Sequence, residues 1–357
     1  MMEDRYHRQT ILPGFGQKGQ SALGKAKVLV VGAGGLGVPV LTYLNAMGIG
    51  TLGIVDADVV SISNLHRQVL YTQAMVGQAK VEVAKAQLLA QNPNTTIHTY
   101  KTYLNPGNAL GIIQKYDIVV DATDNFPTRY LINDVCVLQR KPFVYGALHG
   151  FEGQVSVFNY KDGPTYRCLF PNMPKADEVP NCNEHGVLGI LPGIMGNLQA
   201  LEVVKVVCGL DGVLSGVLLL YDALSQRMQR MKFKPNPENL KINGIQDSYD
   251  FDCEVVMESI EAIGIQNLLR DKKVLLLDVR SKQEFQRNHI KGAKNIPLDA
   301  LENRVGELSR ENPMYVICQS GIRSKKAVLM LQELLPDRKF INVAGGMNQL
   351  NSYANSY

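Results

Sequence analysis

A glycine-rich segment near the amino terminus is the first part of the sequence that could do chemistry. The run VLVVGAGGLG places Gly32, Gly34, Gly35 and Gly37 directly after a strand-like run and before a helical one. Glycines let the backbone approach phosphate oxygens, and the amino terminus of a helix favours their negative charge. Asp56 ends the next strand-like run, where its carboxylate could accept a hydrogen bond from a ribose hydroxyl. The pattern predicts a nucleotide site, and alone it suits a nicotinamide dehydrogenase equally well.

Charged residues beyond Asp56 point away from a dehydrogenase. The run SNLHRQ supplies Asn64 and Arg67, Lys80 stands at the start of a helical run, and Asp124 follows a strand-like run in DATDN. Two cations and a carboxylate at the carboxyl ends of strands fit ATP with Mg²⁺, because the cations offset phosphate charge and the carboxylate can hold the metal. Each residue alone could be a surface charge or a helix cap, but their order favours a triphosphate.

A second reactive segment is CQSGIRS, residues 318–324, between the strand-like run MYVIC and a helical run. Backbone N–H groups of such a loop can turn toward the sulfur of Cys318, while the helix dipole and Arg323 add positive potential that favours a thiolate. Cysteine-dependent phosphatases generally have one residue more between Cys and Arg, which makes room for a tetrahedral phosphate. The shorter loop is better suited to a single sulfane sulfur.

The other cysteines predict no disulfide scaffold, because the sequence contains no C-x-x-C and its cysteines are widely spaced. Cys182 lies in VPNCNEHGVLG, a polar stretch before an apolar helical run, where a thiolate can be favoured. It could equally be an inert loop cysteine. Cys136 and Cys208 fall within apolar helical patterns and are expected in the core.

The elements that must position these residues alternate between strand-like and helical runs through the first two-thirds of the chain. The pattern predicts a doubly wound, Rossmann-like, mostly parallel α/β sheet. Expected strands are 27–31, 51–56, 95–100, 117–123, 217–222 and 228–233, and expected helices are 35–47, 77–93 and 192–208. The segment Val28–Val55 has no charge and is long enough to span a bilayer. Its seven glycines and Pro39 favour a strand, a turn, a helix and a second strand instead.

A composition shift separates a second unit. Residues 236–251 are rich in Asn and Pro without periodicity, which predicts a linker between a domain at 1–235 and a smaller α/β domain at 252–357. Within the smaller domain we expect helices at 299–309 and 323–335.

The composition itself excludes several classes. The chain has 357 residues, 45% hydrophobic and 20% charged, so it can form two or three domains and is not globally disordered. Its net charge of +4 is spread evenly, which argues against nucleic-acid and membrane partners. The polar amino terminus lacks a signal peptide. We therefore expect a soluble, cytoplasmic protein.

The ordered motifs RYHRQ, GAGGLG, VDxDxVxxSNLxRQ, VGQAKVE, DATDN and GFEGQVSVF resemble the bacterial molybdopterin-synthase and thiazole-biosynthesis adenylyltransferases, which are relatives of ubiquitin-activating enzymes. The resemblance covers roughly 3–235. It implies ATP-dependent adenylation of the C-terminal glycine of a ubiquitin-like sulfur carrier ending in Gly-Gly. The pathway it would serve could be that of molybdopterin, thiamine or tRNA thiolation.

Carried over by motif, the resemblance assigns residues to a nucleotide site. The nucleotide-binding residues it implies are Gly32, Gly34, Gly35, Gly37, Asp56, Ser63, Asn64, Leu65, His66, Arg67, Lys80, Asp124 and Asn125. Asp124 would hold Mg²⁺, and Arg67 and Lys80 would neutralise charge on the α-phosphate and the departing pyrophosphate. Arg8 of RYHRQ would act in the site of a neighbouring subunit, which implies a homodimer.

Two cysteines of the first domain are compared with the family's pattern. Many members carry a zinc clamp of two C-x-x-C pairs, but here Cys168 is followed by Pro171 at the second position, and ENLKI stands in place of the other pair. This argues against a structural zinc and leaves Cys168 as a buried thiol, and Asp177, Glu178 and His185 offer no convincing replacement. Cys182 aligns with a loop cysteine that can link covalently to the carrier.

The second domain resembles a rhodanese through CQSGIRS, LLLDVRSKQEF, the run from His289 to Ala293, NIP and AGGM. The resemblance covers about 252–357 and implies that Cys318 accepts sulfur as a persulfide, from a cysteine desulfurase or thiosulfate. Asp278 and Arg280 are expected to hold the fold. The alternatives are adenylation of a peptide or another carboxylate with an auxiliary rhodanese domain, a non-catalytic scaffold, and a nicotinamide oxidoreductase.

Overall fold

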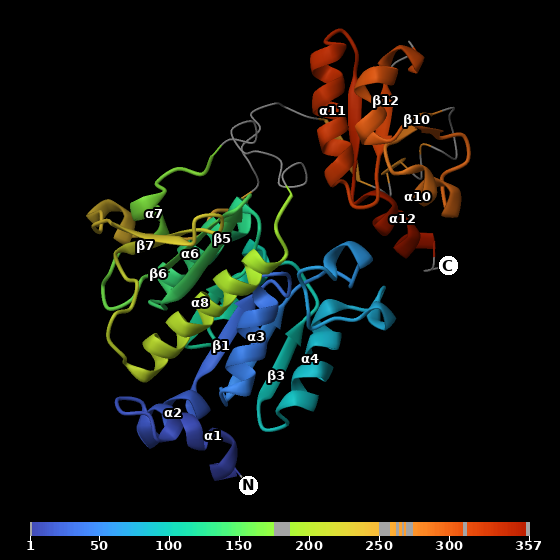
Figure 1. Ribbon diagram of the computed structural model, residues 1–357. Helices are drawn as coiled ribbons and strands as arrows, with labels where there is room; N and C mark the ends of the chain where they lie inside the picture. Colours follow the sequence, from blue (N-terminus) through green and yellow to red (C-terminus); the bar gives the residue numbers. More distant parts are fainter. Residues whose placement is uncertain are drawn as a thin grey trace. The chain divides into compact units, whose positions relative to one another are not determined.

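The computed structural model describes residues 2–174, 186–249, 258–261, 264–265, 268, 274–309 and 313–354. The chain divides into two compact units, Met1–Asp252 and Cys253–Tyr357, each with its own sheet. In Figure 1 the first unit runs from blue to yellow and the second from orange to red.

The first unit is built on an eight-stranded sheet with the order β3-β2-β1-β4-β5-β6-β7-β8. Its strands are β1 Lys27–Val31, β2 Thr51–Val55, β3 Thr96–Tyr100, β4 Ile118–Asp121, β5 Phe143–His149, β6 Glu152–Phe158, β7 Val217–Asp222 and β8 Arg227–Lys232. The strands from β3 to β5 pair in parallel, and β6, β7 and β8 add antiparallel pairs. The strand order reverses between β1 and β4, and ligands of such sheets bind outside the carboxyl ends of the strands at that point.

Helices cover both faces of this sheet (Figure 1). They are α1 Met2–Thr10, α2 Gly16–Lys25, α3 Gly37–Ala46, α4 Lys80–Gln91, α5 Pro106–Ile113, α6 Phe126–Leu138, α7 Tyr166–Leu169 and α8 Ile190–Cys208, with 3-10 helices η1 Ile62–Asn64, η2 Gln73–Met75 and η3 Pro237–Leu240. One core joins α3, α4 and α8, and a second joins α5, α6 and α7. Because both faces are covered, β1 is an almost continuous run of buried valine and leucine. The expected doubly wound fold is confirmed.

Two apolar segments fold into this core. Val28–Val55 forms β1, α3 and β2, as its glycines predict. Within the described ranges, α8 is long and apolar enough to cross a membrane by length and composition, but half of its most apolar window is buried. It packs against α3, β5 and β6, so it is a core helix of the first unit.

Residues 236–249, where the sequence predicts a linker, lie against the first unit. Tyr249 is only 4% exposed, and its hydroxyl donates a hydrogen bond to Asp134 of α6 at 2.7 Å. Ile245 packs against the core that contains α6. This segment is therefore attached through a buried tyrosine and an apolar side chain.

The second unit has a parallel five-stranded sheet with the order β11-β10-β12-β13-β9. Its elements are β9 Ser259–Glu261, β10 Leu275–Asp278, α10 Lys282–Arg287, β11 Lys294–Asn295, η4 Leu298–Ala300, η5 Glu302–Glu307, β12 Met314–Ile317, α11 Ile322–Leu334, β13 Phe340–Ala344 and α12 Gly346–Ala354. The α-helix expected at 299–309 is wrong, since η4 and η5 are 3-10 helices. The three-residue spacing of Leu298 and Leu301 fits their hydrogen bond, because a 3-10 turn repeats every three residues.

Candidate functional site

The glycine loop between β1 and α3 contains two kinds of glycine. Gly32 has φ +101°, and a Cβ there would lie 2.5 Å from the carbonyl oxygen of Ala122. A Cβ on Gly37 would lie 1.9 Å from the Gly32 carbonyl oxygen. Both glycines are therefore required by backbone packing. A Cβ on Gly34 would meet only the amide of Gln68, at 3.5 Å, so this position remains open for a ligand.

The middle of the loop is held by side chains from two other segments. The Ala33 N–H donates to Asp56 Oδ2 at 2.8 Å, and the Tyr71 hydroxyl donates to the Ala33 carbonyl at 2.8 Å. The other Asp56 oxygen accepts from the Asp58 N–H at 2.8 Å. Burial raises the pKa of Asp56, and the nearby Lys80 opposes that rise. Tyr71 could not be identified from the sequence, because nothing in its neighbourhood shows that it faces the loop.

Lys80, the first residue of α4, lies beside the carboxyl end of β2. Its side chain is almost fully buried, and Nζ forms an ion pair with Asp58 Oδ2 at 3.0 Å. The Lys80 N–H donates to the Asp58 carbonyl at 3.0 Å, and the Tyr103 hydroxyl donates to Asp58 Oδ1 at 3.2 Å. Asp58 was missed as a partner of Lys80, although the spacing Asp-x-Asp after β2 was a signal for it.

The segment after β2 brings a second cation to the glycine loop. Arg67 Nη1 donates to the Ser63 carbonyl at 3.1 Å and contacts His66 Nε2 at 2.6 Å. The Arg67 Cδ atom would lie 3.5 Å from a Cβ on Gly35. Gln68 is 3% exposed, and its Oε1 has no hydrogen-bond partner among the described residues. Arg67 and Gln68 therefore border the loop, while Ser63 and His66 are exposed.

Around these residues, Asn64 ends η1, and both Asn64 and Leu65 are half-buried. At the end of β4, the buried Asp121 pairs with Arg129 at 3.0 Å. Asp124 is exposed three residues later, and Asn125 Oδ1 accepts from the Thr128 N–H at 2.9 Å as the cap of α6.

Asp124 differs from Asp121 in exposure: Asp121 is buried in an ion pair with Arg129, whereas Asp124 is exposed. A single exposed carboxylate fits Mg²⁺, which is usually bound by one or two carboxylates together with substrate phosphate oxygens and water. Burial raises the pKa of Tyr103, and the carboxylates of Asp58, Asp56 and Asp124 raise it further. Asp124 follows β4, which runs parallel to β2, so it lies at the same edge of the sheet as Asp58, the partner of Lys80.

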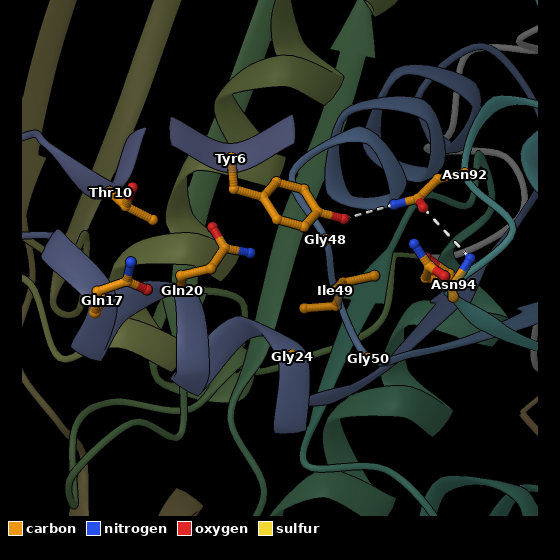
Figure 2. A pocket seen from close by; sticks show the side chains of 11 residues that line it. Tyr6, Thr10, Gln17, Gln20, Gly24, Gly48, Ile49, Gly50, Asn92 and Asn94 are labelled. Atoms are coloured by element: carbon orange, nitrogen blue, oxygen red, sulfur yellow. Dashed lines mark hydrogen bonds between the residues drawn. The ribbon is translucent and has the colours of Figure 1, made fainter. Parts of the chain in front are cut away.

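Arg8 lies at the opposite edge. It is exposed on α1, and α1 borders a cavity of about 310 Å³ beside the amino ends of β2 and β3. Figure 2 shows Tyr6, Gln20 and Asn92 around this cavity, with the Asn92 side-chain amide donating to the Tyr6 hydroxyl at 2.9 Å. Only uncharged residues line the cavity, so it does not suit a triphosphate. The structure does not bring Arg8 to the glycine loop of its own chain.

Hydrogen bonds join the two segments that the resemblance compares with a zinc clamp. Cys168 Sγ accepts from the Asn236 N–H at 3.2 Å, and Thr165 donates to the Asn239 carbonyl at 3.1 Å. The Asn239 side chain donates to the Arg167 carbonyl at 2.8 Å. The expectation that Cys168 is buried is wrong: it is half-buried, because its sulfur faces Asn236 at the surface.

Some of the remaining cysteines and candidate metal ligands lie in the part of the chain that the structure describes, and others do not. Cys136 is fully buried, as expected, whereas Cys208 is only half-buried at the end of α8. In the described ranges, no three His, Cys, Asp or Glu side chains gather as a metal site. Cys182, Asp177, Glu178 and His185 lie outside the described residues.

Cys318 in the second unit follows β12 and is fully buried. Its Sγ accepts from the Gly321 N–H at 3.1 Å and from the Ser324 hydroxyl at 3.4 Å. Gly321 has φ +91°, a conformation that favours glycine and turns the loop around the sulfur. Ser324 was not singled out in the sequence, although it ends the motif CQSGIRS. The arrangement can stabilise negative charge on the sulfur.

Two arginines accompany this loop. Arg323 binds Glu284 through two hydrogen bonds, at 2.7 Å and 2.6 Å. Arg280 binds Asp278 in a buried ion pair at 2.7 Å and donates to Gln319 at 3.0 Å. Arg280 thus ties the loop to the end of β10.

The first unit matches the model of the ThiF family over residues 6–242, which is more than half of the chain. The chain belongs to the ThiF family. Residues 264–352 match the rhodanese-like domain, so a rhodanese-like domain follows the ThiF-family domain. The resemblance drawn from the motifs is confirmed for both parts.

Two named relatives match nearly the whole chain, and a third matches two-thirds of it. "Adenylyltransferase and sulfurtransferase MOCS3" of Sus scrofa is 42% identical, over 96% of this chain and 84% of its own length. The protein of the same name from Arabidopsis thaliana is 41% identical, over 92% of this chain and 79% of its own length. "Sulfur carrier protein adenylyltransferase" of Thermus thermophilus is 53% identical, over 66% of this chain and 88% of its own length.

A solved structure shows the fold of the ThiF-family domain independently. E. coli MccB with MccA-N7isoASN superposes with a TM-score of 0.60 at 23% identity, covering 66% of this chain and 73% of that one. At this identity the likeness concerns the fold alone.

Proposed function

We propose that this chain is an ATP-dependent adenylyltransferase and sulfurtransferase that acts on a ubiquitin-like sulfur carrier. The observation that carries the proposal is that one chain holds two strand-to-helix loops that are both suited to an anion. One is the glycine loop beside Lys80 and Arg67, and the other is the loop around Cys318. Relatives whose names join both activities align with the chain over more than nine-tenths of its length.

In the adenylation step, a carboxylate oxygen of the carrier's C-terminal glycine attacks the α-phosphorus of ATP. The bond to the bridging oxygen breaks, and pyrophosphate leaves with the electron pair. Arg67 and Lys80 offset the charge that builds on the phosphates, and holding both anions in one cleft removes much of the entropic cost of their meeting. Asp124 would hold Mg²⁺, which supplies further positive charge to the phosphates. The products are an acyl-adenylate and pyrophosphate.

In the sulfur step, Cys318 carries the sulfur as a persulfide. The terminal sulfur attacks the acyl carbon, AMP leaves, and an acyl disulfide joins the carrier to Cys318. A thiolate, for which we propose Cys182, attacks the Cys318 sulfur of that bond and releases the thiocarboxylate. A thiol reductant must then reduce the resulting Cys182–Cys318 disulfide by exchange, and such reductants are present in the cytoplasm that we expect for this protein. A cysteine desulfurase or thiosulfate would supply the sulfur.

The position of Arg8 supports a homodimer. Figure 1 shows α1 and α2 below the sheet, whereas the strands β1 and β3 point upward toward the glycine-loop edge. Arg8 therefore lies at the wrong edge to act on the nucleotide of its own chain. If it acts in catalysis, as the resemblance implies, it must do so in the site of a second copy.

The test is carrier-dependent exchange of pyrophosphate into ATP, measured on the full chain. Asp124→Ala should abolish the exchange, and Arg8→Ala should weaken it. Mixing these two variants should restore activity, because one site of a mixed dimer takes Arg8 and Asp124 from intact copies. Absence of exchange by the unchanged chain would reject the adenylation, and absence of rescue in verified mixed dimers would reject the shared site.

A further inference from the structure

The charged side chains beside the Cys318 loop balance one another. Arg323 is bound by Glu284 through both of its terminal nitrogens, and Arg280 is bound by Asp278. The two cations and two carboxylates of these four side chains sum to zero formal charge. The positive potential that the loop motif suggests is therefore largely cancelled by side chains from β10 and α10.

Glu284 is fixed in this position from its own helix as well. The Ser281 N–H donates to Glu284 Oε2 at 3.0 Å, and the Ser281 hydroxyl accepts from the Glu284 N–H at 3.3 Å. These two bonds form a capping box at the start of α10. Hydrogen bonds from Arg323 lower the pKa of Glu284 to about 2, so it is an anion at neutral pH. The carboxylate is thus a permanent neighbour of the Arg323 charge.

The charge of the sulfur donor matters for the first transfer. With thiosulfate, the Cys318 thiolate attacks the outer sulfur, the sulfur–sulfur bond breaks, and sulfite leaves with the electron pair. The donor is a dianion and the nucleophile is an anion, so their approach needs uncompensated positive charge. The Gly321 N–H and the amino terminus of α11 supply only partial charges. The full charge of Arg323 is already matched by Glu284.

We propose that Glu284 is a specificity-determining residue: by neutralising Arg323, it makes the Cys318 loop favour donors with one negative charge, such as thiol persulfides, over the thiosulfate dianion. The inference rests on the proposed sulfurtransferase function. Lys325 and Lys326 are exposed on α11 and attract all anions over a longer range. The effect of Glu284 must therefore be measured as the ratio of the kcat/KM values for two donors that differ in charge.

The experiment uses the full chain with thiosulfate and methanethiosulfonate, with cyanide as the acceptor. Both donors transfer one sulfur to Cys318, and they release sulfite and methanesulfinate, respectively. Glu284→Gln removes the charge, and glutamine can still complete the capping box. The carboxylate of Glu284 repels the two negative charges of thiosulfate but only the one negative charge of methanethiosulfonate, so its removal should help thiosulfate more. We expect kcat/KM to rise about tenfold for thiosulfate and about threefold for methanethiosulfonate.

Two further variants separate this effect from altered folding or general charge. Glu284→Asp keeps the carboxylate and should keep the parent ratio of the two kcat/KM values. Glu307→Gln removes a similarly paired carboxylate, whose partners Arg304 and Lys294 lie outside the loop, and should also leave the ratio unchanged.

Each outcome decides a separate claim. An unchanged ratio in Glu284→Gln, in a chain that transfers sulfur from both donors, overturns the role of Glu284. An equal change of ratio in Glu307→Gln overturns it too, because the effect would then be one of overall charge. If the unchanged chain takes sulfur from neither donor, the sulfurtransferase function fails, and this inference fails with it.

Discussion

The two units build a glycine-containing turn at the same place, the carboxyl end of a parallel strand that leads into a helix, but they complete it differently. The β1–α3 loop begins with Gly32, at φ +101°, and the β12–α11 loop contains Gly321, at φ +91°. The first loop is held by Asp56 and Tyr71, and Lys80 lies beside it, each from a separate segment. The second encloses Cys318 with groups from one short segment of chain.

This difference determines how each site should respond to substitution. A site gathered from many segments shares its support among several side chains, so loss of one supporting side chain should weaken it by degrees, and only loss of the proposed metal ligand Asp124 should abolish the exchange. A site in one loop depends on its one sulfur. Substitutions in the two units should therefore have effects of very different size, and four predictions test this comparison.

The largest effect is expected from Cys318→Ala. Sulfur transfer from thiosulfate or a persulfide should be eliminated, because no other group in the loop can carry the sulfur. Pyrophosphate exchange into ATP should be unchanged, since adenylation uses no sulfur. The measurement is the mass of the carrier after incubation with ATP and a sulfur donor. Formation of the thiocarboxylate from thiosulfate at the parent rate would show that the sulfur does not pass through Cys318.

Gly37→Ala should have the next largest effect. Its Cβ would lie 1.9 Å from the Gly32 carbonyl oxygen, so the backbone must shift, and we expect the free energy of unfolding to fall by about 3 kcal/mol. Chemical denaturation measures this. Gly34→Ala is the matched control, which should fold normally and raise the KM for ATP. Equal stability of both variants would contradict the division of the glycines into packing and ligand-facing positions.

Tyr71→Phe should have a moderate effect confined to the first unit. It removes the hydrogen bond to the Ala33 carbonyl and keeps the buried ring, a change of about 1 kcal/mol. ATP affinity should therefore fall about fivefold, as measured by titration calorimetry, while sulfur transfer by the second unit is unaffected. Tyr43→Phe, on the exposed side of α3, is the control and should bind ATP like the parent. Unaltered ATP binding by Tyr71→Phe would mean that the loop needs no such support.

The smallest effect concerns Glu284 and acid. Hydrogen bonds from Arg323 lower its pKa from 4.5 to about 2, so this carboxylate stabilises the folded second unit above pH 4.5. The contribution is lost as the pH falls from 4.5 toward about 2, and it is small because the pair is partly exposed. Urea unfolding should show a shallower loss of stability over this window in Glu284→Gln. A parent-like slope would indicate that the ion pair does not stabilise the fold.

The sequence predicted features that lie within one segment better than contacts between segments that are far apart in the chain. The glycine loop and the Cys318 loop follow from local patterns, because each needs a strand, a turn and a helix in order. Asp58 and Tyr71 could not be assigned as partners of Lys80 and Ala33, because the contacts arise only when separate segments meet at the sheet edge.

The predictions of a linker at 236–251 and of a helix at 299–309 were also made from local pattern alone. The polar composition of 236–251 predicts a linker, but it does not reveal that Tyr249 finds the buried carboxylate of Asp134 on α6. Leu301, Val305 and Leu308 are spaced by four and three residues, which is the pattern of an α-helix, so the sequence does not predict the 3-10 helices η4 and η5.

The ion pair between Lys80 and Asp58 has a consequence for turnover. Lys80 is almost fully buried and paired with Asp58, so a triphosphate that binds Lys80 as we propose must replace that counter-ion. Binding in the adenylation that we propose is then an exchange of partners, and its net gain is smaller than that of filling an empty cationic site. The same exchange works in reverse: when pyrophosphate and AMP leave, Asp58 takes back the ammonium group. Under the proposed adenylation, this return of Asp58 to Lys80 would favour the release of products.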